Sequence, residues 1–174
     1  MATTFDPSKF AFFYGHGPSA GEFRYMSNFF PSKFTMSHEC IGRPSDTYMY
    51  PTAEHAIMHT KACLMGDGEV AEKILSASSP NAAKKLGRKV KPWDQEKWNS
   101  KVDEIAHAVL LAKFQYNKAL AHRLRGTNEK ILAEASPTDR IWGIGISVAN
   151  AKKGGAWKGR NLLGGALMKV RAEV

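Results

Sequence analysis

A change of pattern at Pro51 constrains the fold of this 174-residue chain more than any other feature of its sequence. Residues 9–50 are rich in aromatic side chains and are interrupted by turn formers such as Gly15, Gly17 and Pro31, which is typical of short strands and loops. After Pro51 the apolar residues recur with a helical period. We therefore expect residues 1–174 to form a single domain that is mainly α (α+β class), with a small β portion in the N-terminal third.

Capping residues and glycines divide the later part of the chain into helices. Ser79 followed by Pro80 marks a helix start, Gly87 a stop, and Asp94 the cap of the longest helix. The helices that these signals predict cover residues 51–65, 69–77, 80–87, 95–116, 119–124, 129–135 and 162–172.

The length and composition exclude several classes of protein. A chain of this length, 43% hydrophobic, buries a core without disulfides or metal. No apolar run approaches the ~20 residues of a membrane-spanning helix, and the N-terminus lacks a signal-peptide layout. Two cysteines, Cys40 and Cys63, are too few for a secreted disulfide framework. We therefore expect an intracellular protein with free thiols, with cytoplasm and nucleus both left open.

The chain carries a large positive charge. Lys and Arg number 25 against 16 Asp and Glu, which gives a formal net charge of +9. The basic residues cluster at Lys84–Lys91 and at Lys152–Arg160. A field of this sign favours anionic partners such as phosphates or nucleic acid, and the alternative is a surface charged only for solubility.

The helix expected after Pro51 carries charge on its apolar face. Glu54, Ile57, Met58 and Lys61 fall at i, i+3, i+4 and i+7, which places them on one face. This spacing exceeds that of an ordinary i,i+4 surface pair. One interpretation is a solvated face. The other is a shared pocket, in which a desolvated lysine is neutral and nucleophilic and the carboxyl group exchanges protons.

The same helix offers a histidine pair, but we expect no metal. His55 and His59 have the i,i+4 spacing of a helical zinc pair. The zinc-protease pattern requires Glu directly after the first histidine, where this chain has Ala56. Cys63 likewise has no assignable base to make it a nucleophile.

Glycine-rich segments near the C-terminus are candidates for phosphate binding. Gly143 and Gly145 flank a tryptophan-containing turn, and a second glycine-rich run leads into the last helix. Unhindered backbone amides and a helix N-terminus both suit a phosphate. Neither segment has the P-loop or dinucleotide pattern, and flexible surface loops are the alternative.

Several blocks in a fixed order resemble the NADAR (YbiA-like) family, and the resemblance covers nearly the whole chain. They are Ser27-Asn28-Phe29, Tyr50-Pro51-Thr52-Ala53-Glu54-His55 with Lys61, Ser79-Pro80 with Leu86-Gly87-Arg88, Lys113-Phe114, Asp139 with Trp142-Gly143-Ile144-Gly145, and Gly159-Arg160-Asn161-Leu162-Leu163-Gly164. The resemblance implies a mainly helical YbiA-like fold and N-glycosidase activity without a cofactor. Some members split ribosylamino-pyrimidine phosphates of riboflavin biosynthesis, and others remove ADP-ribose from the guanine amino group of nucleic acid.

Glu54 and Lys61 are the catalytic candidates that the resemblance implies. Both substrate types join an exocyclic amine to the anomeric carbon of a phosphorylated ribose. We expect Lys61 to form a Schiff base with this carbon and Glu54 to move the protons. The competing mechanism is a single displacement by water, with Lys61 only binding. Asp139 is an alternative acid or the cap of a turn.

The implied substrate-binding residues surround these candidates in the family's motifs. Asn28 would hydrogen-bond the ribose or base and Phe29 would pack or stack on it. Trp142 would stack on a base. The remaining implied contacts, to the phosphates, are Gly143, Gly145, Arg160, Asn161 and Gly164. A structural role is the alternative for each of these residues except Trp142.

The positive charge favours ADP-ribosylated guanine, and hence reversal of a DNA modification, over the riboflavin intermediates. Residues 36–49 resemble an insertion relative to the short family form, and such loops often border a pocket. The partners we expect are an ADP-ribose-bearing nucleotide or nucleic acid and a cognate ADP-ribosyltransferase, with no membrane. A non-catalytic ADP-ribose-binding module and a basic nucleic-acid-binding protein remain alternatives.

Overall fold

The computed structural model describes residues 5–40 and 43–174 of the chain. It divides into two compact units, unit 1 with Met1–Phe30 and Ala119–Val174, and unit 2 with Pro31–Lys118. The strands are β1 (Phe10–Phe13), β2 (Phe34–Cys40), β3 (Arg43–Tyr50) and β4 (Ile131–Glu134). The helices are α1 (Ala53–Met65), α2 (Gly68–Leu75), α3 (Pro80–Gly87), α4 (Gln95–Tyr116), α5 (Lys118–Arg125), α6 (Val148–Lys152) and α7 (Leu162–Arg171), and three 3-10 turns cover Pro7–Lys9, Pro18–Ala20 and Glu22–Met26.

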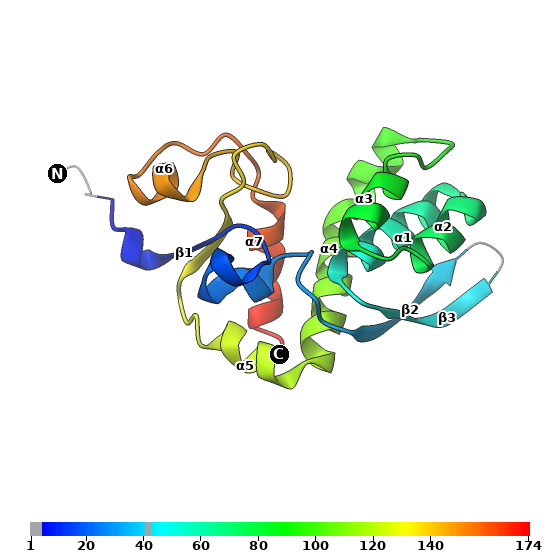
Figure 1. Ribbon diagram of the computed structural model, residues 1–174, viewed down its shortest axis with the longest axis horizontal. Helices are drawn as coiled ribbons and strands as arrows, with labels where there is room; N and C mark the ends of the chain where they lie inside the picture. Colours follow the sequence, from blue (N-terminus) through cyan, green and yellow to red (C-terminus); the bar gives the residue numbers. More distant parts are fainter. Residues whose placement is uncertain (1–4, 41–42) are drawn as a thin grey trace. The chain divides into compact units, whose positions relative to one another are not determined.

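Unit 2 is built around α1, which packs against α2, α3 and α4 and against the β2–β3 hairpin (Figure 1). Residues 53–59 of this helix are all buried. The antiparallel hairpin pairs Phe34 with Tyr50 and Cys40 with Arg43. Both Phe34 and Tyr50 are fully buried, so the base of the hairpin contributes to the same core as α1.

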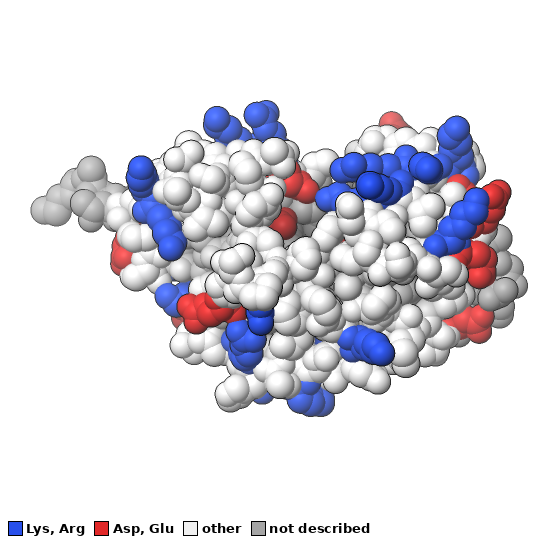
Figure 2. Space-filling view, in the orientation of Figure 1, with Lys and Arg blue, Asp and Glu red and all other residues white. Residues whose placement is uncertain are grey.

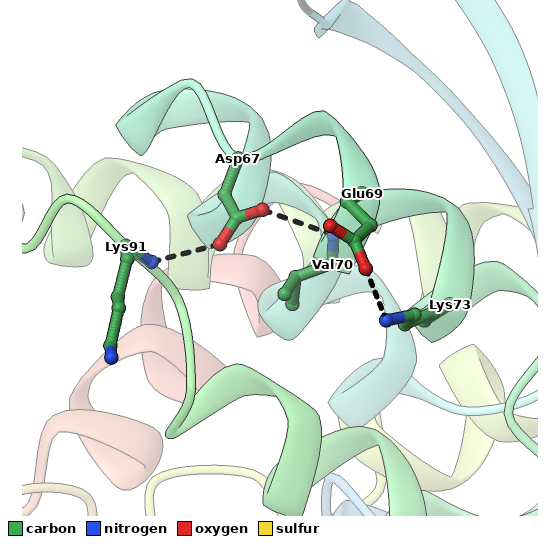
Figure 3. A network of polar contacts seen from close by, with 5 residues as sticks. All are labelled: Asp67, Glu69, Val70, Lys73 and Lys91. Atoms are coloured by element: carbon green, nitrogen blue, oxygen red, sulfur yellow. Dashed lines mark hydrogen bonds and ion pairs between the residues drawn. The ribbon is translucent and has the colours of Figure 1, made fainter.

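Side-chain caps start the helices of unit 2, because a cap accepts from a backbone N–H that has no partner within the helix. Ser79 accepts from Ala82 N and Asp94 from Lys97 N, as the sequence predicts. Asp67 caps α2 through Val70 N and also accepts from Lys91 N at 2.8 Å (Figure 3). Asp67 thereby ties the segment before α4 to the start of α2, beside an exposed Glu69–Lys73 pair within α2.

Unit 1 contains a two-stranded parallel sheet whose strands are far apart in sequence. β1 pairs with β4 in the register Phe10 with Ile131 to Phe13 with Glu134, and α7 packs on β4. Phe12 and Ala133 lie in a buried apolar cluster with Ile144 and Ile146 from the following loop. The long glycine-rich loop is therefore part of the core of this unit.

The structure confirms the mainly helical class and most of the predicted helices. The helix predicted over residues 129–135 is wrong, since Ile131–Glu134 is a strand paired with β1. Its partner lies over a hundred residues earlier, so the local pattern did not indicate the pairing. The short helix α6 was not predicted, and the described residues of the segment 36–49 belong to the strands β2 and β3.

The expectation of free thiols is also wrong. Cys40 on β2 and Cys63 on α1 form a disulfide, with an S–S distance of 1.97 Å. The sequence reasoning counted cysteines but did not place them, whereas the hairpin brings the end of β2 against α1. Among the described residues no helix is both long and apolar enough to cross a membrane.

The contact between α1 and α3 requires a glycine at position 87. A Cβ atom added at Gly87 would lie 2.1 Å from the sulfur of Met58 and 2.9 Å from its Cγ. We expect Gly87→Ala to lower the free energy of unfolding by about 1–3 kcal/mol, since Met58 must leave its packed position. Gly165→Ala in α7 is the control, because nothing lies within 4 Å of a Cβ there. Denaturant unfolding measures the free energy of unfolding of both variants. An equal change in the two variants would contradict the packing argument.

Candidate active site

The two catalytic candidates, Glu54 and Lys61, lie on α1. The structure shows whether the helix face that carries them is exposed to solvent or buried. Thr52 caps α1 with its hydroxyl group and Gly66 ends it in the left-handed region. Glu54 is only 6% exposed and Ile57 is fully buried. Lys61, two turns after Glu54, is half-buried. The solvated face is therefore excluded for Glu54, and the amine of Lys61 is partly withdrawn from water.

Two tryptophans flank the amine of Lys61. Its Nζ lies 4.4 Å from the ring centroid of Trp93 and 5.5 Å from that of Trp98. Trp98 comes from α4, and Trp93 precedes that helix and is 42% exposed. Ring faces attract a cation and exclude water from one side of it. Lys61 is thus held between an aromatic wall and solvent.

The net effect of the surroundings of Lys61 is to lower its pKa. Burial lowers the pKa of Lys61, the positive charge of Arg88 lowers it further, and the carboxylate of Glu54 opposes both by raising it. The net direction is downward, so a larger fraction of this amine is unprotonated near neutral pH than of an exposed lysine. The Coulombic effect of Glu54 also shows that the acid and the amine act on each other along α1.

Basic residues cluster on α3, the helix that follows α2 in the sequence. Lys84 and Lys85 lie in its last turn, and Arg88 is its C-terminal cap; Figure 2 shows the basic side chains over this helix. Lys85, Arg88 and Lys89 are exposed. The predicted basic cluster is therefore exposed at the surface. The charge of Arg88 also lowers the pKa of Lys61.

The other predicted site residues belong to unit 1. Asn28 is 7% exposed, and its Oδ1 has no hydrogen-bond partner among the described residues. A buried acceptor without a partner is costly, which favours a ligand as its missing partner. Phe29 follows, half-buried, with its ring 5.6 Å from that of His16.

Asp139 acts as the cap of a turn. Its Oδ1 accepts from Ile141 N at 2.9 Å and from Trp142 N at 2.8 Å. This carboxylate oxygen is thereby engaged by backbone amides, which is the second of the two roles that the sequence leaves open. Trp142 itself is half-buried, so part of its ring is accessible for stacking.

The two glycines of the tryptophan turn are required by packing. Gly143 is buried, and a Cβ there would lie 2.8 Å from the carbonyl oxygen of Glu134. Gly145 has a φ of +70°, a left-handed conformation that favours glycine. Gly143 thus approaches the backbone of β4 and of its own turn, and Gly145 approaches Arg140 and Lys158.

Asn161 and Gly164 join the start of α7 to β4. Asn161 is buried with a φ of +54°, donates to Leu132 O and accepts from Glu134 N. A Cβ at Gly164 would lie 2.0 Å from Leu132 O. Both residues therefore have a structural role in unit 1, while Arg160 is exposed beside them.

The structure thus brings the predicted residues together in two sets. Glu54 and Lys61 share α1 in unit 2, where sequence reasoning missed the tryptophan contact. Asp139 is bonded to Trp142, and Asn161 N donates to Gly143 O, so these four residues share one loop of unit 1. Trp93 and Trp98 are separated from Lys61 by more than thirty residues, so no local signal indicated that contact.

The predicted histidine pair of α1 is divided between two environments. The ring of His55 meets Thr52 Oγ1 at 2.8 Å and the carbonyl oxygen of Ala77 at 3.1 Å, so both nitrogens are used. The ring of His59 instead lies beside His38 and Cys63, and within the described residues these three are a group with the geometry to hold a metal ion. Burial lowers the pKa of both His38 and His59.

Comparison with known proteins identifies the relatives of this chain. The profile of the NADAR domain matches residues 12–174. "N-glycosidase R617" of Acanthamoeba polyphaga mimivirus is 34% identical over 170 residues, which cover 97% of this chain and 98% of that protein. The riboflavin biosynthesis protein VVA0006 of Vibrio vulnificus is 31% identical over 150 residues, covering 86% of this chain and 35% of that protein.

One solved structure has the same fold. The NMR structure of the E. coli protein YbiA matches with a TM-score of 0.71 at 24% identity, covering 94% of this chain and 84% of that one. At this identity the match concerns the fold, and it agrees with the mainly helical architecture described above.

The pKa of Lys61 is predicted to lie below that of Lys73. Burial lowers the first, whereas the hydrogen bond to Glu69 raises the second, which lies on the surface of α2. NMR titration of isotopically methylated lysines measures both values in one sample. Glu54→Gln should lower the pKa of Lys61 further, since it removes the charge that raises it, and Arg88→Met should raise it. A Lys61 value at or above that of Lys73 would contradict the account.

Two buried asparagines of unit 1 are predicted to respond differently to truncation. Asn161→Ala removes two hydrogen bonds to β4 and should cost about 1–3 kcal/mol of stability. Asn28→Ala removes an oxygen without a hydrogen-bond partner in residues 5–40 and 43–174, so it should leave the melting temperature nearly unchanged and weaken ADP-ribose binding. Thermal melting and calorimetric titration check both. A loss of stability from Asn28→Ala as large as that from Asn161→Ala would assign it a structural role.

Proposed function

The chain belongs to the NADAR family, and on that premise we propose that it is an N-glycosidase that removes ADP-ribose from guanine bases of nucleic acid or nucleotides. The observation that carries the proposal is the buried Glu54 two turns before a half-buried Lys61 on the same helix, whose pKa is lowered. Replacing the base nitrogen at the ribose C1′ requires a group that donates a proton to the leaving nitrogen and a neutral amine that attacks the carbon.

The proposed reaction begins at the ribose C1′, which carries both the ring oxygen and the exocyclic amine. The carboxylate of Glu54 first takes the proton of the Lys61 ammonium, which frees the lone pair of Nζ. The bond from C1′ to the ring oxygen breaks with its electron pair on the oxygen, which opens the ring to an iminium. Nζ then adds to C1′ and passes a proton to the ring oxygen. The bond from C1′ to the base nitrogen then breaks, and its electron pair leaves with that nitrogen, which takes a proton from Glu54. A ribose–lysine Schiff base remains.

Water completes the cycle. Glu54, now a carboxylate, takes a proton from a water molecule that adds to C1′. The hydroxyl proton of the resulting carbinolamine passes to Nζ as the C1′–Nζ bond breaks with its electron pair on Lys61. The released aldehyde closes to the free ribose, and Glu54 returns its proton to the amine. Both protein groups end in their starting protonation states, so no cofactor is needed.

The charge of the chain supports an ADP-ribosylated substrate. The diphosphate of ADP-ribose carries negative charge, and the net charge of +9 with a basic surface at α3 attracts it. Asn28 and the accessible part of Trp142 are suited to a ribose hydroxyl and a base, respectively. Ribosylamino-pyrimidine phosphates are the second candidate substrates, because a relative is named a riboflavin biosynthesis protein.

The test compares both substrate classes. Purified protein is incubated with an ADP-ribosylated guanine oligonucleotide and, separately, with the ribosylamino-pyrimidine phosphates, and mass spectrometry follows the products. Release of unmodified guanine and free ADP-ribose is the expected result. Turnover of the pyrimidine phosphates alone would show that these, and not ADP-ribosylated guanine, are the substrates. Binding of ADP-ribose without any turnover would favour a binding module.

The Schiff base has its own test. Borohydride added during turnover should reduce the C=N bond and leave a ribose-containing adduct on Lys61, located by peptide mass spectrometry. Lys61→Arg and Glu54→Gln should each lower kcat by roughly 10²–10⁴-fold. Lys73→Arg, at an exposed surface pair on α2, is the control and should keep full activity. Near-normal activity of Lys61→Arg without an adduct would instead support direct displacement by water.

A further inference from the structure

Two histidines and two cysteines meet where β2 packs against α1. His38 and Cys40 lie two residues apart on β2, and His59 and Cys63 lie four apart on α1. A spacing of four places two side chains on one face of a helix. The strand and the helix thus each present one histidine and one cysteine to the same point, and none of the four is used in the proposed reaction.

The distances between the four side chains are those of a cluster. His38 Nε2 lies 3.3 Å from His59 Nδ1, and Cys63 Sγ lies 3.6 Å from His59 Nε2 and 4.0 Å from its Nδ1. One donor atom from each of His38, His59 and Cys63 lies within 4.8 Å of the others. Cys40 Sγ is joined to Cys63 Sγ, so the fourth donor is bonded directly to a member of this group.

These separations suit a tetrahedral ion. Zinc binds imidazole nitrogen at ~2.0–2.1 Å and thiolate sulfur at ~2.3 Å, which separates the ligand atoms by roughly 3.3–3.8 Å. The nitrogen pair already has this separation. The two sulfur atoms are too close, because a covalent bond joins them. Breaking that bond removes this restriction.

A tyrosine holds the histidines in place. The hydroxyl oxygen of the fully buried Tyr50 lies 2.7 Å from His38 Nε2 and 2.7 Å from His59 Nδ1. Two ring nitrogens from different elements therefore already converge on one polar atom. An ion bound by both nitrogens would take over this shared contact, with the hydroxyl group beside it as a hydrogen-bonding neighbour.

We propose that reduction of the Cys40–Cys63 disulfide creates a Cys₂His₂ site for Zn²⁺, with His38 and His59 as the other two ligands. A small dithiol supplies two electrons and two protons, is itself oxidised to its disulfide, and leaves two thiols on the protein. Zn²⁺ then displaces both thiol protons and binds the thiolates. The disulfide and the zinc site exclude each other, because each uses the same two sulfur atoms.

The site links β2 to α1 in both states. α1 carries Glu54 and Lys61, and Lys61 lies between His59 and Cys63 in sequence. With the disulfide closed, a covalent bond ties α1 to the hairpin, and with zinc bound, four coordinate bonds do so. The reduced protein without metal loses both links, so its α1 should be the least constrained of the three forms.

The test uses the full-length protein in oxidised and reduced forms, after removal of the dithiol in the absence of oxygen. We expect the reduced form to bind one Zn²⁺ per chain by elemental analysis and the oxidised form none. Bound zinc should protect both thiols from a thiol-specific reagent. Co²⁺ in place of zinc should give the absorption of a tetrahedral ion with thiolate ligands.

Variants identify the histidine ligands. His38→Ala and His59→Ala should each weaken zinc binding by the reduced protein at least 10-fold, while His122→Gln, at an exposed position on α5, should not change it. The Co²⁺ spectrum of the wild-type protein remains a test if a variant does not fold. The proposal is overturned if the reduced wild-type protein binds no zinc, if Co²⁺ shows no thiolate absorption, or if folded variants of both histidines bind zinc as tightly as wild type.

Discussion

The burial of α1 is the constraint on which the rest of unit 2 depends. A helix that is covered by α2, α3, α4 and the hairpin has little contact with water, and a carboxyl group and an amine on such a helix behave differently from surface groups. Burial disfavours the charged form of Lys61, while Glu54 supplies a compensating charge on the same helix. The contacts that stabilise α1 therefore also affect the pKa of Lys61, because they bury part of its side chain.

Different residues of α1 contact different parts of unit 2. Gly87 on α3 allows close packing against Met58, and Thr52 and Ala77 hold the ring of His55. On another part of the helix, His59 and Cys63 meet β2. The catalytic candidates lie among these structural contacts, which leaves their helix little freedom to shift. A reactive amine held in this way approaches a substrate with little loss of conformational entropy.

Unit 1 shows how residues of a family motif can serve the fold. Asp139 caps its own turn, and Asn161 bonds to the backbone of β4 at Leu132 and Glu134. Asn28 is different, because its buried oxygen has no hydrogen-bond partner within the described part of the chain. The sequence alone ranks these polar residues alike, and only the hydrogen bonds in the folded chain separate the structural asparagine from the one suited to a ligand.

Local signals in the sequence determined the helix starts at Ser79 and Asp94, the helix of residues 53–65, and the spacing of Glu54 and Lys61 on one face, because capping and helical periodicity act over a few residues. The tertiary structure alone decided that Ile131–Glu134 is a strand, that Cys40 meets Cys63 beside two histidines, and that Trp93 covers Lys61. Each of these depends on a partner more than twenty residues away, and the partner becomes a neighbour only when the chain is folded. The lowered pKa of Lys61 belongs to the same class, since burial is a property of the packed core.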